Sequence, residues 1–69
     1  MILRVPKEET VFLYQLLEGY DGVANFSTLP FDKSQGYRDI EIYITEGMQA
    51  EFNVVLENLR REIDFTVLN

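Results

Sequence analysis

Apolar and polar residues follow regular patterns along almost the whole chain, and these patterns predict six elements. Two helical segments are expected: the first begins at Pro6 and ends near Gly19, and the second begins at Thr45 and ends near Ile63. Runs rich in β-branched and aromatic residues predict four strands, which cover Ile2–Val5, Val23–Leu29, Tyr37–Ile44 and Asp64–Leu68. The predicted order is therefore strand, helix, strand, strand, helix, strand.

Each predicted helix carries one apolar stripe. The first stripe comprises Leu13, Leu16, Leu17 and Tyr20, which lie at i, i+3, i+4 and i+7. Phe12 widens this stripe. The second stripe extends over about four turns and comprises Met48, Phe52, Val55, Leu56, Leu59 and Ile63. Thr45 is the expected N-cap of the second helix, with Glu46 in its first turn.

The strands also have one strongly apolar face each, which is clearest where Ile40, Ile42 and Ile44 alternate with polar or aromatic residues. Two helices on one face of a four-stranded antiparallel sheet bury all of these stripes and faces together. Two right-handed split βαβ units give the sheet order 4-1-3-2. We therefore expect an α+β, ferredoxin-like βαββαβ sandwich in which residues 1–69 form a single domain.

The opposite face of this sheet is expected to be open. It collects Ile2, Arg4, Asn25, Ser27, Glu41, Tyr43, Thr66 and Leu68, and Arg4 and Glu41 are expected to form a cross-strand pair. The apolar members are either ordinary surface residues or a contact for a second copy or another protein. The candidate interface residues are Ile2, Arg4, Glu41, Tyr43 and Leu68.

Size and composition favour self-association. A chain of 69 residues buries too little surface to be more than marginally stable alone. It has no cysteine to form a disulfide and no histidine for an ordinary zinc site. Oligomerisation is the remaining common remedy, so we expect a homodimer.

The acidic balance disfavours two classes of partner. Twelve acidic side chains face six basic ones, a formal net charge of −6, and the basic residues do not cluster. Phosphate backbones and anionic lipid surfaces are repelled by such a charge, so we expect no nucleic acid and no membrane partner. The chain enters a strand directly at Ile2 without the apolar stretch of a signal peptide, which predicts a cytoplasmic protein.

Catalytic components are scarce. Without cysteine or histidine, the serines and threonines have no base of matched pKa nearby in sequence. The glutamates of the second helix fit its solvated face better than a cation site, and no phosphate-binding glycine pattern occurs. The sequence therefore predicts a non-enzymatic protein and implies no cofactor and no metal.

Two resemblances bear on function. The stretch from Leu16 to Phe26, with its helix end, glycine turn and strand start, resembles the ACT-type regulatory domains. In that family amino acids often bind where the loop between strand one and helix one meets a neighbouring subunit; the corresponding loop here is Val5-Pro6-Lys7, where the family usually has a glycine. The whole chain resembles more specifically a bacterial family, number 4911 among the domains of unknown function. The residues that carry this resemblance are Val5-Pro6, Leu17 to Gly22, Ala24, Thr28, Leu56, Leu59 and Glu62-Ile63.

The resulting hypothesis is a small ACT-like binding or regulatory module that acts as a homodimer. Its candidate ligand-binding residues lie at the two ends of the first helix: Pro6, Lys7, Asp21, Gly22 and Asn25. The same residues are also explained as turn and cap positions alone. The alternative hypothesis is a protein-interaction adaptor that does not respond to small molecules. It would bind another protein on the open sheet face or along the strand from Val23 to Leu29.

Overall fold

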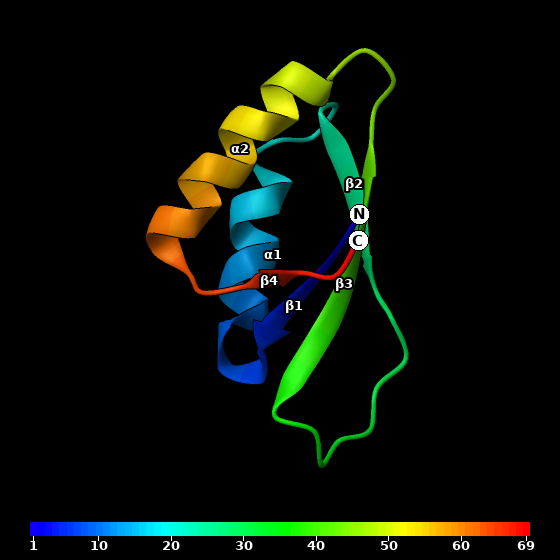
Figure 1. Ribbon diagram of the computed structural model, residues 1–69, viewed down its shortest axis with the longest axis vertical. Helices are drawn as coiled ribbons and strands as arrows, with labels where there is room; N and C mark the ends of the chain where they lie inside the picture. The colour runs from blue at the N-terminus through cyan, green and yellow to red at the C-terminus, as the bar shows by residue number, and fades with distance from the viewer.

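In the computed structural model, which describes all 69 residues, two helices cover one face of a four-stranded sheet (Figure 1). Every neighbouring pair of strands is antiparallel, and the sheet order is β2-β3-β1-β4, as the sequence predicted. The elements in chain order are β1 (Ile2–Pro6), a short 3-10 helix η1 (Lys7–Glu9), α1 (Thr10–Glu18), β2 (Ala24–Thr28), β3 (Tyr37–Ile44), α2 (Gln49–Glu62) and β4 (Thr66–Val67).

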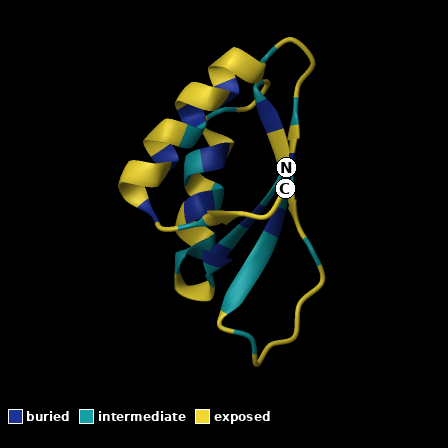
Figure 2. Ribbon diagram, in the orientation of Figure 1, coloured by how far each residue is buried: buried dark blue, intermediate teal, exposed yellow.

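The core lies between the helices and the sheet (Figure 2). It contains eleven buried side chains, all apolar: Leu3, Val5, Leu13, Leu17, Ala24, Ile40, Ile42, Phe52, Val55, Leu59 and Ile63. The predicted stripes of both helices therefore supply the core, because their i, i+3 and i+4 positions face the sheet. Phe12 is an exception: it is exposed, since it lies on the flank of α1 and not above a strand.

The strand β3 has the predicted bounds, and its register corrects one predicted contact. Arg4 lies opposite Asp39, whereas Glu41 lies opposite Ile2. The predicted pair between Arg4 and Glu41 is therefore wrong, although both side chains do lie on the open face. The register places the carboxylate of Asp39, and not that of Glu41, directly opposite Arg4.

The start of α2 also differs from the prediction, because Thr45 is not its N-cap. The N–H of Thr45 donates to the carbonyl of Val23 and so extends the ladder between β2 and β3. Gly47 then takes a positive φ of 84°, which a right-handed helix does not allow. The helix begins only at Gln49, and its N-cap residue, Met48, makes no side-chain capping hydrogen bond.

The final strand is shorter than predicted: β4 has two residues, where five were expected. The hydrogen-bonded positions of β1 on this side are Ile2 and Arg4, since Leu68 donates to the carbonyl of Ile2 and Arg4 lies opposite Thr66. The next such position is Pro6, which has no N–H to donate. The ladder therefore ends there, and the chain diverges from β1 before Thr66.

Candidate functional site

The open face of the sheet carries an arginine held in a fixed position. The guanidinium of Arg4 donates two hydrogen bonds to the carboxylate of Asp39, at 2.9 and 3.0 Å, and lies 4.0 Å from the ring centroid of Tyr37. The hydrogen bond to Asp39 raises the pKa of Arg4, and the hydrogen bond from Arg4 lowers the pKa of Asp39. This bidentate pair neutralises itself, so Arg4 is a structural residue of the open face and not a free cation.

The other candidate interface residues on this face do not form a continuous apolar patch. Tyr43 is 55% exposed and Leu68 is 42% exposed, but they extend from β3 and from the residues after β4, with β1 between these strands. The hydroxyl of Tyr43 donates to Glu41, and this hydrogen bond raises the pKa of Tyr43. Ile2 is half-buried between them. The open face is therefore mixed, with polar groups that already pair with one another.

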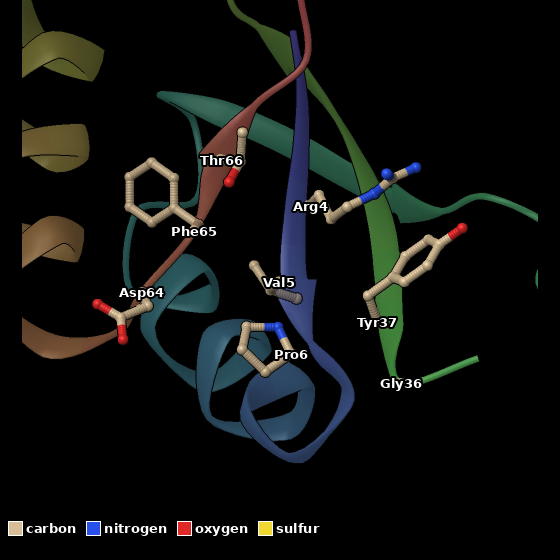
Figure 3. A pocket seen from close by; sticks show the side chains of 8 residues that line it. All are labelled: Arg4, Val5, Pro6, Gly36, Tyr37, Asp64, Phe65 and Thr66. Atoms are coloured by element: carbon tan, nitrogen blue, oxygen red, sulfur yellow. The ribbon is translucent and has the colours of Figure 1, made fainter. Parts of the chain in front are cut away.

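A pocket of about 350 Å³ opens beside the end of β1, where the ladder to β4 stops (Figure 3). Phe65 and Asp64 form one side, Tyr37 and Arg4 the other, and Val5 and Pro6 lie between them. The remaining lining residues are Gly36 and Thr66. The pocket exists because Pro6 ends the ladder and leaves space where Asp64 would otherwise pair.

The structure separates the five candidate ligand-binding residues. Pro6 lines the pocket beside β1, and the N–H of Lys7 donates to the carbonyl of Gly36 at the same end of the sheet. Asp21 and Gly22 lie in the turn before β2, at the opposite end, and Gly22 adopts a positive φ of 92°. Asn25 is exposed on the open face, opposite Tyr43. Within one chain, these residues do not form a single site.

The outer edge of β2 is a row of backbone groups without partners in the chain. The ladder between β2 and β3 contains bonds from Leu29 to Asp39 and from Thr45 to Val23. In an antiparallel pair hydrogen-bonded positions alternate, so Asn25 and Ser27 also bond to β3, while Ala24, Phe26 and Thr28 direct their N–H and C=O groups outward. None of the five residues of β2 is charged, and none is proline. Natural edge strands are usually protected by such residues.

Aromatic side chains from two elements flank this edge on the helix side of the sheet. The ring of Tyr14 stacks on that of Phe26, with centroids 5.1 Å apart, and its hydroxyl hydrogen-bonds with Thr28. Val11 and Glu18 lie on the same side of α1 as Tyr14, since they are three residues before it and four after it. Val11 is 67% exposed. The edge is therefore bordered by apolar surface that no other part of the chain covers.

The two ends of this edge have opposite charge. Beyond its carboxyl end, the guanidinium of Arg38 lies 3.8 Å from the ring centroid of Phe31 and donates to the carbonyls of Gln35 and Tyr37. Burial raises the pKa of Tyr14, and the positive charge of Arg38 offsets part of that rise. At the amino end, Asp21 and Glu18 carry negative charges. None of these three charged side chains forms an ion pair within the chain.

We call this region the β2 edge surface and define it by Val11, Tyr14, Phe26, Phe31 and Arg38 around the outward groups of β2. Sequence reasoning named the strand as a docking edge but missed Arg38 and Tyr14. The position of Tyr14 at this edge depends on the packing of α1 over β2, and the only signal for it in the sequence is the i, i+3 spacing of Val11 and Tyr14 on a helix next to an uncharged strand. The position of Arg38 depends on the register of β3 against β2.

Other chemistry has little support in the arrangement of side chains. No three His, Cys, Asp or Glu residues lie close enough together to hold a metal ion. A second hollow of about 280 Å³ lies between the two helices, where Leu16 and Tyr20 face Asn58 and Arg61. Neither helix has the length and apolar character needed to cross a bilayer.

Comparisons with known proteins agree with the resemblance to a family of unknown function. The family model described as "Domain of unknown function (DUF4911)" matches residues 3–63. The chain therefore belongs to the DUF4911 family. No curated protein and no solved structure matches it significantly. The matched segment covers the sheet from Leu3 through β3, both helices and the last core residue, Ile63.

Proposed function

We propose that this DUF4911 chain is a non-enzymatic, ACT-like binding or regulatory module of the bacterial cytoplasm, and that it acts as a homodimer. Its βαββαβ order and its sheet order, both expected from the sequence pattern, are consistent with a ferredoxin-like domain. The observation that carries the proposal is the β2 edge surface, an uncharged edge strand with outward hydrogen-bonding groups at Ala24, Phe26 and Thr28. A second copy is the partner that this edge suits best.

The edge is self-complementary about Phe26. If two copies of β2 pair antiparallel around a two-fold axis at this residue, Phe26 faces its own copy and Ala24 faces Thr28. All three positions have outward N–H and C=O groups, so about six hydrogen bonds form, two for each hydrogen-bonded pair. The next outward positions, Gly22 and Pro30, would also face each other. Gly22 turns the chain at its positive φ, and Pro30 has no N–H to donate. The ladder between the two copies of β2 therefore stops at the same pair of residues at each of its ends.

This pairing would join the two sheets into one of eight strands with all four helices on one face. It would cover the stacked rings of Tyr14 and Phe26 and the exposed Val11, and so bury apolar surface that a marginally stable chain leaves in water. The alternative surface, the open face, offers Arg4, Asp39 and Glu41 to any partner. Two copies stacked through that face would have to bury the Arg4–Asp39 ion pair and Glu41, and taking these charges out of water is costly.

Antiparallel pairing also brings the separated candidate residues to the same end of the joined sheet. The end of the sheet that carries Pro6 and Lys7 in one copy also carries the carboxyl end of β2. That end would face the amino end of β2 in the second copy, which carries Asp21, Gly22 and Asn25. In the joined sheet the two sets of residues would lie at the same end, but β2 and β3 would stand between them, so the sets would be three strand spacings apart, about 14 Å. Only a ligand long enough to span these strands would contact both sets.

The test is the solution mass of the wild-type chain and of two proline variants. Thr28→Pro removes an outward N–H from the proposed dimer edge, while Val67→Pro removes one from the opposite edge of the sheet, because the bonded positions of β4 are Thr66 and Leu68. We expect a wild-type dimer, a monomeric Thr28→Pro variant and a dimeric Val67→Pro variant. If both proline variants stay dimeric, the dimer uses another surface and the proposed edge is wrong. A thermal-shift screen of amino acids and nucleotides on the dimer then tests the binding role.

The same unprotected edge favours a second candidate function, an adaptor that binds an extended segment of another protein by strand addition. This alternative predicts a wild-type monomer at high micromolar concentration and no melting response to small molecules. A peptide partner would then protect the amide protons of Ala24, Phe26 and Thr28 from exchange. The homodimer would protect the same three amides in the absence of any partner.

A further inference from the structure

The two ends of the β2 edge surface carry opposite charges, and this arrangement bears on which molecules can pair there. Asp32 lies in the loop beyond the carboxyl end of β2, where its carboxylate accepts hydrogen bonds from the N–H and the hydroxyl of Ser34. The four other charged side chains near the two ends are Lys33 and Arg38, beyond the carboxyl end, and Glu18 and Asp21, before the amino end, so the carboxyl end has a net positive charge. Arg4 and Asp39 form the one ion pair within the chain, so these four charges are not neutralised internally. An antiparallel two-fold axis places the basic end of one copy against the acidic end of the other, twice in each dimer.

We propose that Arg38 of one copy pairs with Asp21 of the other and that these two ion pairs select a second copy of this chain as the partner. The inference rests on the proposed dimer through β2. On β3, Arg38 lies beside Pro30, because Leu29 bonds to Asp39. In the register centred on Phe26, Pro30 faces Gly22 of the second copy. Arg38 and the turn at Gly22 are then two strand spacings apart, about 10 Å, which an extended arginine and the neighbouring Asp21 can bridge.

Arg38 is already positioned for this contact. Its guanidinium lies against Phe31, and only one of its terminal nitrogens is used, to donate to the carbonyls of Gln35 and Tyr37. The remaining N–H groups have no hydrogen-bond partner within the chain. Arginine is suited to such a site because its planar fork keeps donors free for a carboxylate while its face stacks on a ring. Phe31, 46% exposed, would be covered by the turn of the second copy.

The pairs also address the electrostatic cost of dimerisation. Each chain has a formal net charge of −6, so two copies repel each other unless opposite charges meet at the interface. A partner whose edge carries the charges in the reverse order would place like charges together at both ends, which disfavours it. The ion pairs therefore act on specificity as well as on affinity.

Charge reversal gives a discriminating test. Asp21→Arg places two arginines together at each end of the dimer, and Arg38→Asp places two aspartates together. We expect each variant alone to dimerise at least about tenfold more weakly than the wild type. An equimolar mixture of the two variants restores both opposite-charge pairs, and so does the double variant. We expect heterodimers in the mixture, identified by native mass spectrometry, with an affinity near that of the wild type.

Two features separate this inference from simpler explanations. Asp21→Arg lowers the overall negative charge, so general repulsion alone predicts a tighter dimer, whereas the ion pair predicts a weaker one. Glu57→Arg, the same charge change on the exposed side of α2, serves as the matched control and is expected to leave the dimer intact. Rescue in the mixture also excludes a disordered Arg38 loop as the cause, because mixing would not repair it.

The outcomes distinguish this inference from the proposal on which it rests. If the wild type is a dimer, Thr28→Pro abolishes it and the charge variants dimerise like the wild type, the ion pairs are wrong and the β2 dimer stands. If the single variants are weakened but their mixture is not restored, the pairing of Arg38 with Asp21 is also wrong. A wild-type monomer overturns the proposed function itself, and the ion pairs with it.

Discussion

The side chain of Phe52 is expected to be a major contributor to the stability of the fold. It is the largest fully buried side chain of the chain, with 0% exposure, and it anchors α2 on the core. Phe52→Ala removes the ring and leaves a cavity that the surrounding apolar side chains fill only in part. Changes of this kind cost about 3–5 kcal/mol.

That cost is large for a chain of this size. At about 0.05–0.15 kcal/mol per residue, 69 residues give a total stability of about 3–10 kcal/mol. Phe52→Ala would therefore remove about 30% or more of the free energy of unfolding. At the lower end of the stability range it would unfold the chain. Val54 supplies the matched control, because it lies on the same helix but is 57% exposed. Val54→Ala is expected to change stability by less than about 0.5 kcal/mol.

Urea denaturation followed by far-ultraviolet circular dichroism measures both variants. The comparison is made at one protein concentration, because dimerisation adds to the apparent stability. We expect Phe52→Ala to lower the midpoint strongly, with little change of slope, and Val54→Ala to leave it in place. Equal midpoints for the two variants would refute the packing of α2 described above.

Three further changes test individual contacts. The hydrogen bond from Arg4 holds the pKa of Asp39 below its ordinary value. The stability that ionised Asp39 contributes is therefore complete above about pH 4 and is lost as pH falls through the depressed pKa. The difference in stability between the wild type and Asp39→Asn, measured by urea titration, should shrink in acid. Burial raises the pKa of Tyr14, so the wild type should lose stability as pH rises above 10. Tyr14→Phe should lose less than the wild type in thermal melts, and the raised pKa of Tyr43 accounts for the loss that remains. Gly47→Ala forces alanine into a positive φ and should cost about 1–2 kcal/mol, whereas Gly36→Ala, in open space without a positive φ, should be close to neutral in the same melts.

The sequence was sufficient for the elements and for which side chains face the core. The bounds of β3 were predicted correctly because Ile40 and Ile42 alternate with polar neighbours, and this pattern has only one solution as a half-buried strand. The order of the strands also followed, since the rules for crossover handedness leave few topologies. The alternation of apolar and polar residues along a strand indicates which face of the sheet each side chain occupies. It does not determine which residue of the neighbouring strand lies opposite.

The register explains the error in the predicted pair of Arg4. A shift of two residues keeps every side chain on its own face, so Asp39 and Glu41 satisfy the pattern equally well. The start of α2 was misplaced for a similar reason. Thr45 has the chemistry of an N-cap, but its N–H belongs to the ladder with Val23, and that contact joins residues far apart in sequence.

The candidate site depended most on the tertiary structure. Pro6 was identified as a loop residue, but its role in ending the ladder to β4, and so in opening the pocket beside Asp64 and Phe65, required the relative positions of two strands. Arg38 was counted only as a scattered basic residue. Its place against Phe31 arises from the path of the loop after β2, which brings Phe31 back to the start of β3.

The most direct test of the central claim is sedimentation equilibrium of the wild-type chain and the Thr28→Pro variant over a range of protein concentrations. The chain has a mass of 8.1 kDa, so a dimer is readily distinguished from a monomer. The proposed β2 pairing predicts twice this mass for the wild type at micromolar concentration and the monomer mass for Thr28→Pro. A wild type that stays monomeric, or a Thr28→Pro variant that sediments as the wild-type dimer does, would contradict it.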